Sequence, residues 1–162
     1  ILLLNVVTAL VIGLLTEQLA VVAVFTLSFM VLRSYTGGYH SDSRVFCYLG
    51  SNLVLLVPVY TQAVFYKTSL AWLLAVLLVS AGIIFLLSPM HSKNRKLDKE
   101  EQKHFGRKAR LIAALELAVL GILWHAGQIP YAYAVYTGIC ITALFMLVGK
   151  AQLWIQSHTE NG

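Results

Sequence analysis

The stretch Arg33–Ser51, RSYTGGYHSDSRVFCYLGS, separates two long apolar runs and places one histidine and one cysteine in a short polar segment. Glycines and Ser/Asp residues lie beside this pair, and such residues interrupt helices or begin new ones. A histidine and a cysteine can supply a base and a thiol nucleophile. Most of the remaining sequence is apolar, so this segment is the first candidate for a functional site.

The composition of the chain predicts a membrane protein. Of its 162 residues, 59% are hydrophobic and 12% are charged, and the mean hydropathy is +0.76, whereas soluble domains carry about 25% charged residues. The apolar runs are too long for β-strands and lack the alternation of a membrane barrel. They are roughly Ile1–Leu15, Leu19–Leu32, Val45–Tyr66, Leu70–Ser88, Ala109–Ala126 and Tyr131–Gly149. Because backbone groups in lipid must be satisfied within the chain, we expect an all-α membrane protein with six transmembrane helices.

The first two runs are short and are separated only by Thr16-Glu17-Gln18. They can form a tight helical hairpin or one bent, partly re-entrant element. Glu17 is poorly tolerated at the centre of a bilayer, which favours the hairpin. With three prolines and no Ser/Gly-rich linker, residues 1–162 read as a single integral-membrane domain. The chain opens in apolar sequence without Met, so we expect the natural protein to begin with a further N-terminal segment.

Basic residues are concentrated at one end of the predicted bundle. Six spans place both termini on one side, together with residues 33–44 and 89–108, and only Lys67 among the basic residues lies on the other. The eleven on the first side are Arg33, Arg44, Lys93, Arg95, Lys96, Lys99, Lys103, Arg107, Lys108, Arg110 and Lys150. Positive residues stay cytoplasmic, so we predict a multi-pass protein of the cell membrane with both termini and the His/Cys segment on the cytoplasmic side. The charge follows topology and does not indicate nucleic-acid binding.

The spacing of His40 and Cys47 predicts a helix break between them. On one straight helix they would share a face, but an offset of seven positions would place them about 10 Å apart along the axis. A base must approach its nucleophile to about 3 Å or act through one water. Gly37-Gly38 permits a turn, and Ser41, Asp42 and Ser43 are good N-cap residues. We therefore expect a loop through His40 and a helix that begins near Asp42 or Ser43.

Each of these features also has a purely structural interpretation. A cysteine in a membrane helix commonly packs, and a histidine near the end of a span commonly lies at the interface. The same sequence therefore also fits a non-catalytic membrane peptide transporter or a partner-binding subunit, or an enzyme that acts on lipid headgroups. The basic segment Ser88–Arg110 either marks topology and attracts headgroups or docks an acidic peptide.

Other polar residues carry weaker signals. Cys140 falls in the middle of a span and reads as packing. Glu116 lies inside the fifth span, where a carboxylate is a functional candidate or satisfies a buried polar neighbour. His91 and His104 lie in the basic segment, but their spacing matches no zinc signature, and we expect neither a metal nor a cofactor.

These motifs together resemble the accessory gene regulator protein B family. The resemblance rests on Arg33, the Gly37-Gly38-Tyr39-His40 run, the six-residue gap to Cys47, and Ser51. Ser88-Pro89 after the fourth span and the basic run Lys93-Asn94-Arg95-Lys96 extend it. The hydropathy pattern agrees over nearly the whole chain.

The resemblance implies a membrane cysteine endopeptidase of a quorum-sensing system. His40 and Cys47 fall on the catalytic pair of the family. The substrate implied is a membrane-associated autoinducing-peptide precursor, whose C-terminal tail is removed and whose remainder is cyclised to a thiolactone or lactone. A homodimer is also implied. Candidate substrate-binding residues are Arg33, Gly37, Gly38, Arg44, Ser51, Lys93, Arg95 and Lys96, of which the basic ones are suited to an acidic tail.

Overall fold

A computed structural model describes residues 2–36, 44–89 and 99–159, and all regular structure within them is helical. The six helices are α1 Leu2–Leu15, α2 Leu19–Thr36, α3 Arg44–Lys67, α4 Leu70–Leu87, α5 Lys99–His125 and α6 Ile129–Thr159. Their order and positions follow the six apolar runs of the sequence. The all-α prediction is therefore confirmed for the described residues.

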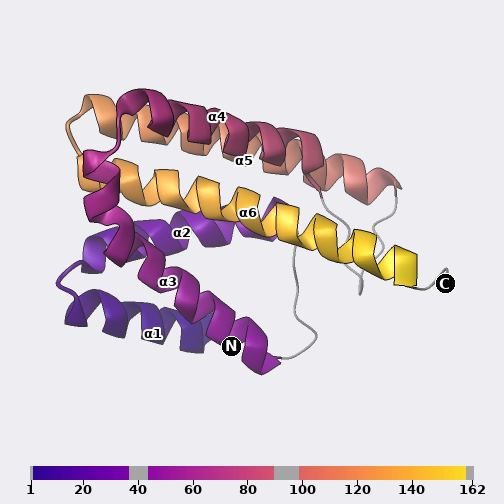
Figure 1. The fold of residues 1–162 in the computed structure, drawn as a ribbon, viewed down its shortest axis with the longest axis horizontal. Helices are drawn as coiled ribbons and strands as arrows, with labels where there is room; N and C mark the ends of the chain where they lie inside the picture. The colour runs from indigo at the N-terminus through magenta and orange to yellow at the C-terminus, as the bar shows by residue number, and fades with distance from the viewer. Residues whose placement is uncertain (1, 37–43, 90–98, 160–162) are drawn as a thin grey trace.

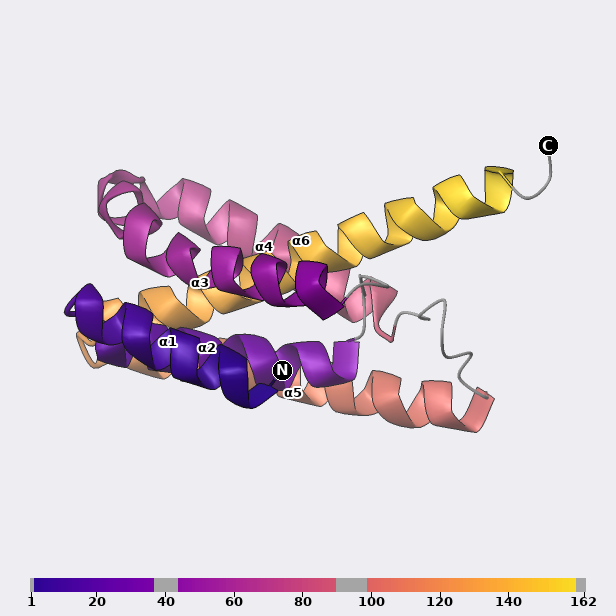
Figure 2. The ribbon, with the colours of Figure 1, turned by 90° about the horizontal axis from the view of Figure 1, so that it is seen from below.

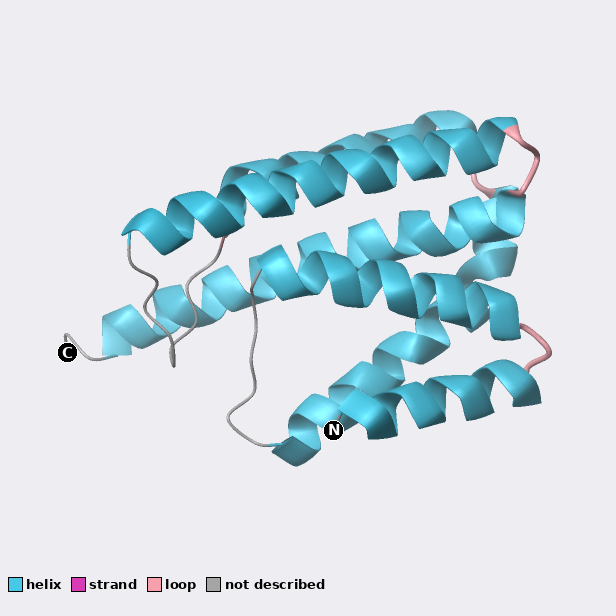
Figure 3. Ribbon diagram, turned by 180° about the vertical axis from the view of Figure 1, so that it is seen from behind, coloured by secondary structure: helices cyan, strands magenta, loops and turns pink. Residues whose placement is uncertain are grey.

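The helices form a bundle with two distinct ends (Figure 1). Three tight connections at one end join α1 to α2, α3 to α4 and α5 to α6, and we call this the short-turn end. The start of α1, the end of α6 and the helix ends that flank residues 37–43 and 90–98 lie at the other, which we call the long-loop end (Figures 1 and 3). That the long-loop end faces the cytoplasm remains a prediction from the distribution of basic residues.

The short turns explain why consecutive helices run back along each other. Leu15 ends α1 and Leu19 begins α2, so the hairpin predicted around Glu17 is what the structure contains. Glu17 itself has a positive φ of 57°. Gly127, with φ of 72°, occupies the turn before α6, where a left-handed backbone favours glycine.

Helix α6 lies at the centre of the bundle and contributes to both hydrophobic clusters. One cluster joins α6 to α1, α2 and α3 around Phe25, Phe65 and Tyr133. The other joins α6 to α2, α4 and α5 around Leu32, Ile84 and Ile139. Figure 2 shows α6 crossing the bundle and extending beyond it at the long-loop end. Because α6 contacts helices on both sides, it sets the relative positions of the others.

Three helices of the described residues are long and apolar enough to cross a membrane. These segments are Leu19–Thr36, Leu70–Leu87 and Ile129–Ile155. The apolar part of α1, Leu4–Leu15, is shorter, and the 14 residues of α1 measure about 21 Å, against about 30 Å of hydrocarbon. The chain is thus a membrane-associated helical protein, and six spans remain a prediction.

Helices α5 and α6 extend furthest beyond their apolar runs. Helix α5 begins at Lys99 although the apolar run begins near Ala109, and α6 continues to Thr159 although its run ends near Gly149. The added turns are rich in Lys, Glu and Gln, which are good helix formers. Hydropathy marks only the part of a helix suited to lipid, so it underestimates helices that continue into polar surroundings.

Candidate active site

The predicted catalytic cysteine is the fourth residue of α3, which begins at Arg44. Helix α2 ends at Thr36, so Arg33 and Cys47 are on different helices. His40, Gly37 and Gly38 fall among residues 37–43, outside the described residues, and the predicted break between His40 and Cys47 stays a prediction. The structure does show where α3 begins, and Cys47 is in the first turn of this helix.

Ser51 follows Cys47 by four residues on the same helix. Residues four apart lie on one face of an α-helix, about one turn from each other. Positions 47 and 51 therefore lie one turn apart along α3. Arg44 begins the helix, three residues before Cys47.

Arg33 contacts two aromatic rings near the end of α2. Its guanidinium carbon lies 4.7 Å from the ring centroid of Phe145 on α6 and 5.8 Å from that of Phe29, one turn back on α2. Both distances are in the range of cation–π attraction. Because Arg33 is half-buried, these contacts hold its charge at the joint between α2 and α6, shortly before residues 37–43.

The end of α2 also packs on the start of α5. The rings of Tyr35 and Phe105 have centroids 6.4 Å apart, and the ammonium of Lys108 lies 6.0 Å from the Tyr35 centroid. Thr36, the last residue of α2, is fully buried. The polypeptide therefore enters residues 37–43 from a fixed point beside the basic start of α5.

The basic segment is anchored at both of its ends. The Arg110 side chain donates from Nε to the backbone oxygen of Phe85 over 3.1 Å, which joins α5 to α4. A Cβ on Gly106 would come within 2.9 Å of Pro89 Cδ, so glycine permits the close approach of α5 to the residues after α4. Lys93, Arg95 and Lys96 fall among residues 90–98, outside the described residues.

Helix α3 is tied to α6 by a buried tyrosine. The Tyr133 hydroxyl donates to the backbone oxygen of Pro58 over 2.9 Å and lies 2.6 Å from Thr61 Oγ1. Pro58 is inside α3 and has no N–H to donate within the helix. This link was not predicted from the sequence, because hydropathy does not reveal which polar groups meet across helices.

The structure also describes the polar residues that carried weaker signals in the sequence. Glu116 accepts a hydrogen bond from the Ser28 hydroxyl, so it satisfies a buried polar neighbour. Cys140 is partly buried in the middle of α6. His104 is exposed on α5, and its ring contacts Phe105, with centroids 6.0 Å apart. Within the described ranges no three His, Cys, Asp or Glu residues group closely enough to hold a metal ion.

The fold and the helix ends around Cys47 define a class of protein. The chain is a membrane-associated helical bundle with a cysteine in the first turn of α3 and basic residues gathered at the same long-loop end.

Comparison with known proteins then identifies the family. A model of the family described as Accessory gene regulator B matches residues 1–147. The accessory gene regulator protein B of Staphylococcus intermedius is 26% identical over 121 residues, which cover 75% of this chain and 62% of that protein. The chain thus spans about three fifths of that relative's length. No solved structure matches. The chain belongs to the accessory gene regulator B family.

Proposed function

We propose that this protein is a membrane cysteine endopeptidase that removes the C-terminal tail of an autoinducing-peptide precursor and cyclises the remainder. The observation that carries the proposal is family membership over residues 1–147 in a chain whose Cys47 lies in the first turn of α3. The positive end of a helix dipole favours a thiolate, and a neighbouring histidine favours it further.

The first half of the reaction forms an acyl-enzyme. His40 takes the proton of the Cys47 thiol, and the sulfur attacks the carbonyl carbon of the scissile amide. Backbone N–H groups at the start of α3 or at Gly37-Gly38 stabilise the oxyanion. The C–N bond then breaks, and His40 returns its proton to the leaving amine of the tail. A thioester between the precursor and Cys47 remains.

The second half closes the ring. A thiol or hydroxyl of the precursor attacks the thioester carbonyl and gives its proton to His40, which passes it to the departing Cys47 sulfur. A thiol gives a thiolactone and a hydroxyl gives a lactone. The internal nucleophile outcompetes water because its effective concentration is high, and an apolar site limits hydrolysis.

Basic residues at the long-loop end hold the acidic tail in this proposal. Arg33 is fixed by the rings of Phe29 and Phe145, and Arg44 begins the helix that carries Cys47. Lys93, Arg95 and Lys96 add charge from the segment between α4 and α5. The reaction replaces an amide by a less stable thioester. Binding of the released tail by the basic residues, followed by its removal, therefore draws the reaction forward.

The test compares precursor processing by Cys47→Ser, His40→Ala and Cys140→Ser variants in membranes, with products identified by mass spectrometry. We expect Cys140→Ser to produce the released tail and the cyclic product, and the other two to produce neither. Processing that persists in Cys47→Ser and His40→Ala excludes the enzyme and favours a peptide transporter or partner-binding subunit. Crosslinking in membranes tests the homodimer, which should appear as a species of twice the mass of the chain.

A further inference from the structure

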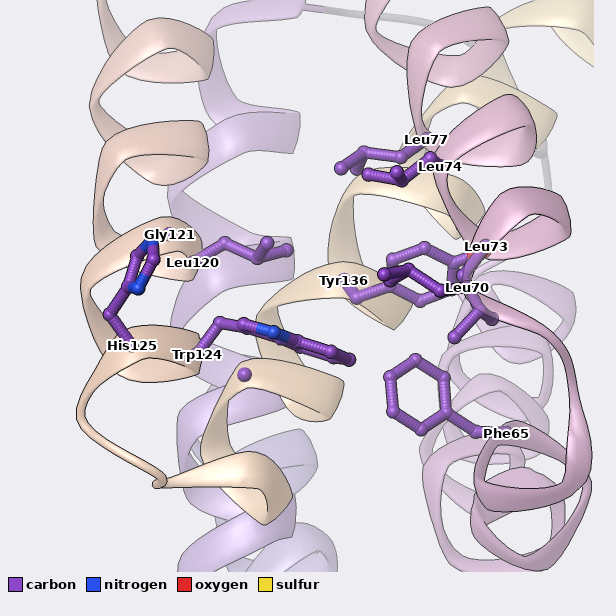
Figure 4. A pocket seen from close by; sticks show the side chains of 11 residues that line it. Phe65, Leu70, Leu73, Leu74, Leu77, Leu120, Gly121, Trp124, His125 and Tyr136 are labelled. Carbon is purple, nitrogen blue, oxygen red and sulfur yellow. The ribbon is translucent and has the colours of Figure 1, made fainter.

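A cavity of about 280 Å³ lies at the short-turn end of the bundle, away from the proposed active site. It lies between α4 on one side and α5 on the other, with α6 behind it (Figure 4). Its wall includes Leu70, Leu74 and Leu77 of α4, Leu120 and Trp124 of α5, and Tyr136 of α6. Neither the peptidase mechanism nor the basic segment uses this cavity.

The lining indicates which kind of molecule fits. Aliphatic and aromatic side chains form nearly the whole surface, and no Lys, Arg, Asp or Glu residue lines it. A peptide segment would bring backbone polar groups into this surface, and those groups cost free energy when they are buried without partners. A hydrocarbon chain has no such groups. Apolar contact therefore favours a lipid tail over a peptide.

The position of the cavity supplies the second argument. Leu70 begins α4 and His125 ends α5, and both line the cavity, so it reaches the level of the short turns. Trp124 is in the same wall, and tryptophan favours the membrane–water interface. Lys67, the last residue of α3, is exposed and precedes Leu70 of the wall by three residues in the sequence. A positive charge therefore lies at the same end of the bundle as the cavity.

We propose that this cavity binds one acyl chain of an anionic phospholipid, with the phosphate near Lys67 and His125. The bound chain contacts Phe65 of α3, whose ring centroid lies 4.8 Å from that of Tyr133 and 5.3 Å from that of Tyr136. The lipid therefore fills the space between α4 and α5, beside α6, and stabilises the packing of these helices. This binding is independent of the peptidase activity.

Two glycines provide a matched pair of variants for the test. Gly121 lines the cavity, and Gly82 on α4 does not. A Cβ at either position meets no atom within 4 Å, so neither position is crowded at the first side-chain atom. Gly121→Leu fills the cavity, and Gly82→Leu makes the same chemical change and the same gain in helix propensity outside it.

The probe is phosphatidylglycerol with a diazirine on one acyl chain, added in trace amount to the purified chain in detergent and photolysed. We expect labelling of peptides from residues 70–77 and 120–125 that excess unlabelled phosphatidylglycerol abolishes. Gly121→Leu should reduce this saturable labelling about tenfold or more, because leucine occupies the space of several lipid carbons. Gly82→Leu should leave the labelling unchanged. Lys67→Gln should weaken labelling by this probe more than labelling by its phosphatidylcholine analogue.

Equal saturable labelling of the wild type and Gly121→Leu overturns the proposal, as does labelling of the wild type that excess lipid does not reduce. Equal labelling by the phosphatidylcholine analogue, unaffected by Lys67→Gln, overturns the headgroup assignment. If Gly121→Leu does not fold, the position and saturation of the label on the wild-type chain decide the question.

Discussion

The Ser28 hydroxyl donates a hydrogen bond of 2.8 Å to the Oε2 atom of Glu116, which joins α2 to α5 inside the bundle. Both residues are buried, with relative exposures of 7% and 8%. The same α2 carries Arg33 five residues later, and the same α5 carries the basic turns that pack on Tyr35. This bond thus helps to set the geometry of the long-loop end.

Replacing Glu116 should destabilise the protein, and the loss should be larger when the new side chain cannot accept the hydrogen bond from Ser28. Glu116→Leu leaves the Ser28 hydroxyl without its acceptor, and we expect a loss of about 1–3 kcal/mol in the free energy of unfolding. Glu116→Gln keeps an acceptor oxygen and should cost less. Thermal unfolding in detergent measures both, with Glu100→Gln at an exposed position as the control. Wild-type stability in Glu116→Leu shows that the bond does not stabilise the bundle.

Gly138 tests the close approach of α6 to α2. An added Cβ would lie 2.7 Å from the oxygen and 3.3 Å from the Cβ of Ser28. Gly138→Ala should therefore destabilise by about 1–3 kcal/mol, because the helices must separate or Ser28 must leave Glu116. Gly82→Ala meets no neighbour and should be neutral or stabilising by up to about 1 kcal/mol. Equal unfolding temperatures for the two alanine variants contradict this packing.

Tyr133 should hold the helix that carries Cys47. Tyr133→Phe keeps the ring but removes the hydroxyl that bonds the Pro58 oxygen, and we expect a loss of about 0.5–1.5 kcal/mol in stability. Precursor processing should also slow, since α3 is then less firmly positioned. Tyr66→Phe, at an exposed position on α3, is the control. The prediction fails if the two phenylalanine variants process the precursor at the same rate and unfold at the same temperature.

Arg33 and Phe145 should be energetically coupled. A double-mutant cycle with Arg33→Gln and Phe145→Leu should give a coupling free energy of about 0.5–2 kcal/mol, the range for cation–π pairs. Arg33→Lys keeps the charge but loses the planar guanidinium, so it should retain only part of the coupling. Strictly additive effects of the two substitutions on unfolding show that the 4.7 Å contact does not hold Arg33 in place.

The sequence was sufficient to predict the helices and the hairpin at Glu17, because apolar runs of this length and a polar interruption have few other structural solutions. It also singled out Cys47 by spacing, and α3 begins at Arg44, close to the predicted Asp42 or Ser43. The cytoplasmic side and the break at His40 remain predictions.

Contacts between distant residues could not be predicted. Phe29 and Arg33 are one helical turn apart, so that contact was visible in the sequence, but nothing there indicated Phe145. Likewise, Glu116 was expected to satisfy some buried polar group, yet Ser28 is 88 residues away. Such pairs depend on helix packing, which hydropathy and spacing do not encode.

The covalent intermediate is the most direct test of the proposed activity. The chain is mixed with a precursor whose internal Cys or Ser nucleophile is replaced by Ala, so that ring closure is blocked, and the protein is analysed by intact mass and peptide mapping. The proposal predicts a hydroxylamine-sensitive thioester on Cys47, with the released tail in equal amount, and none in His40→Ala. Tail release with no adduct on Cys47, or an adduct on Cys140 instead, contradicts it.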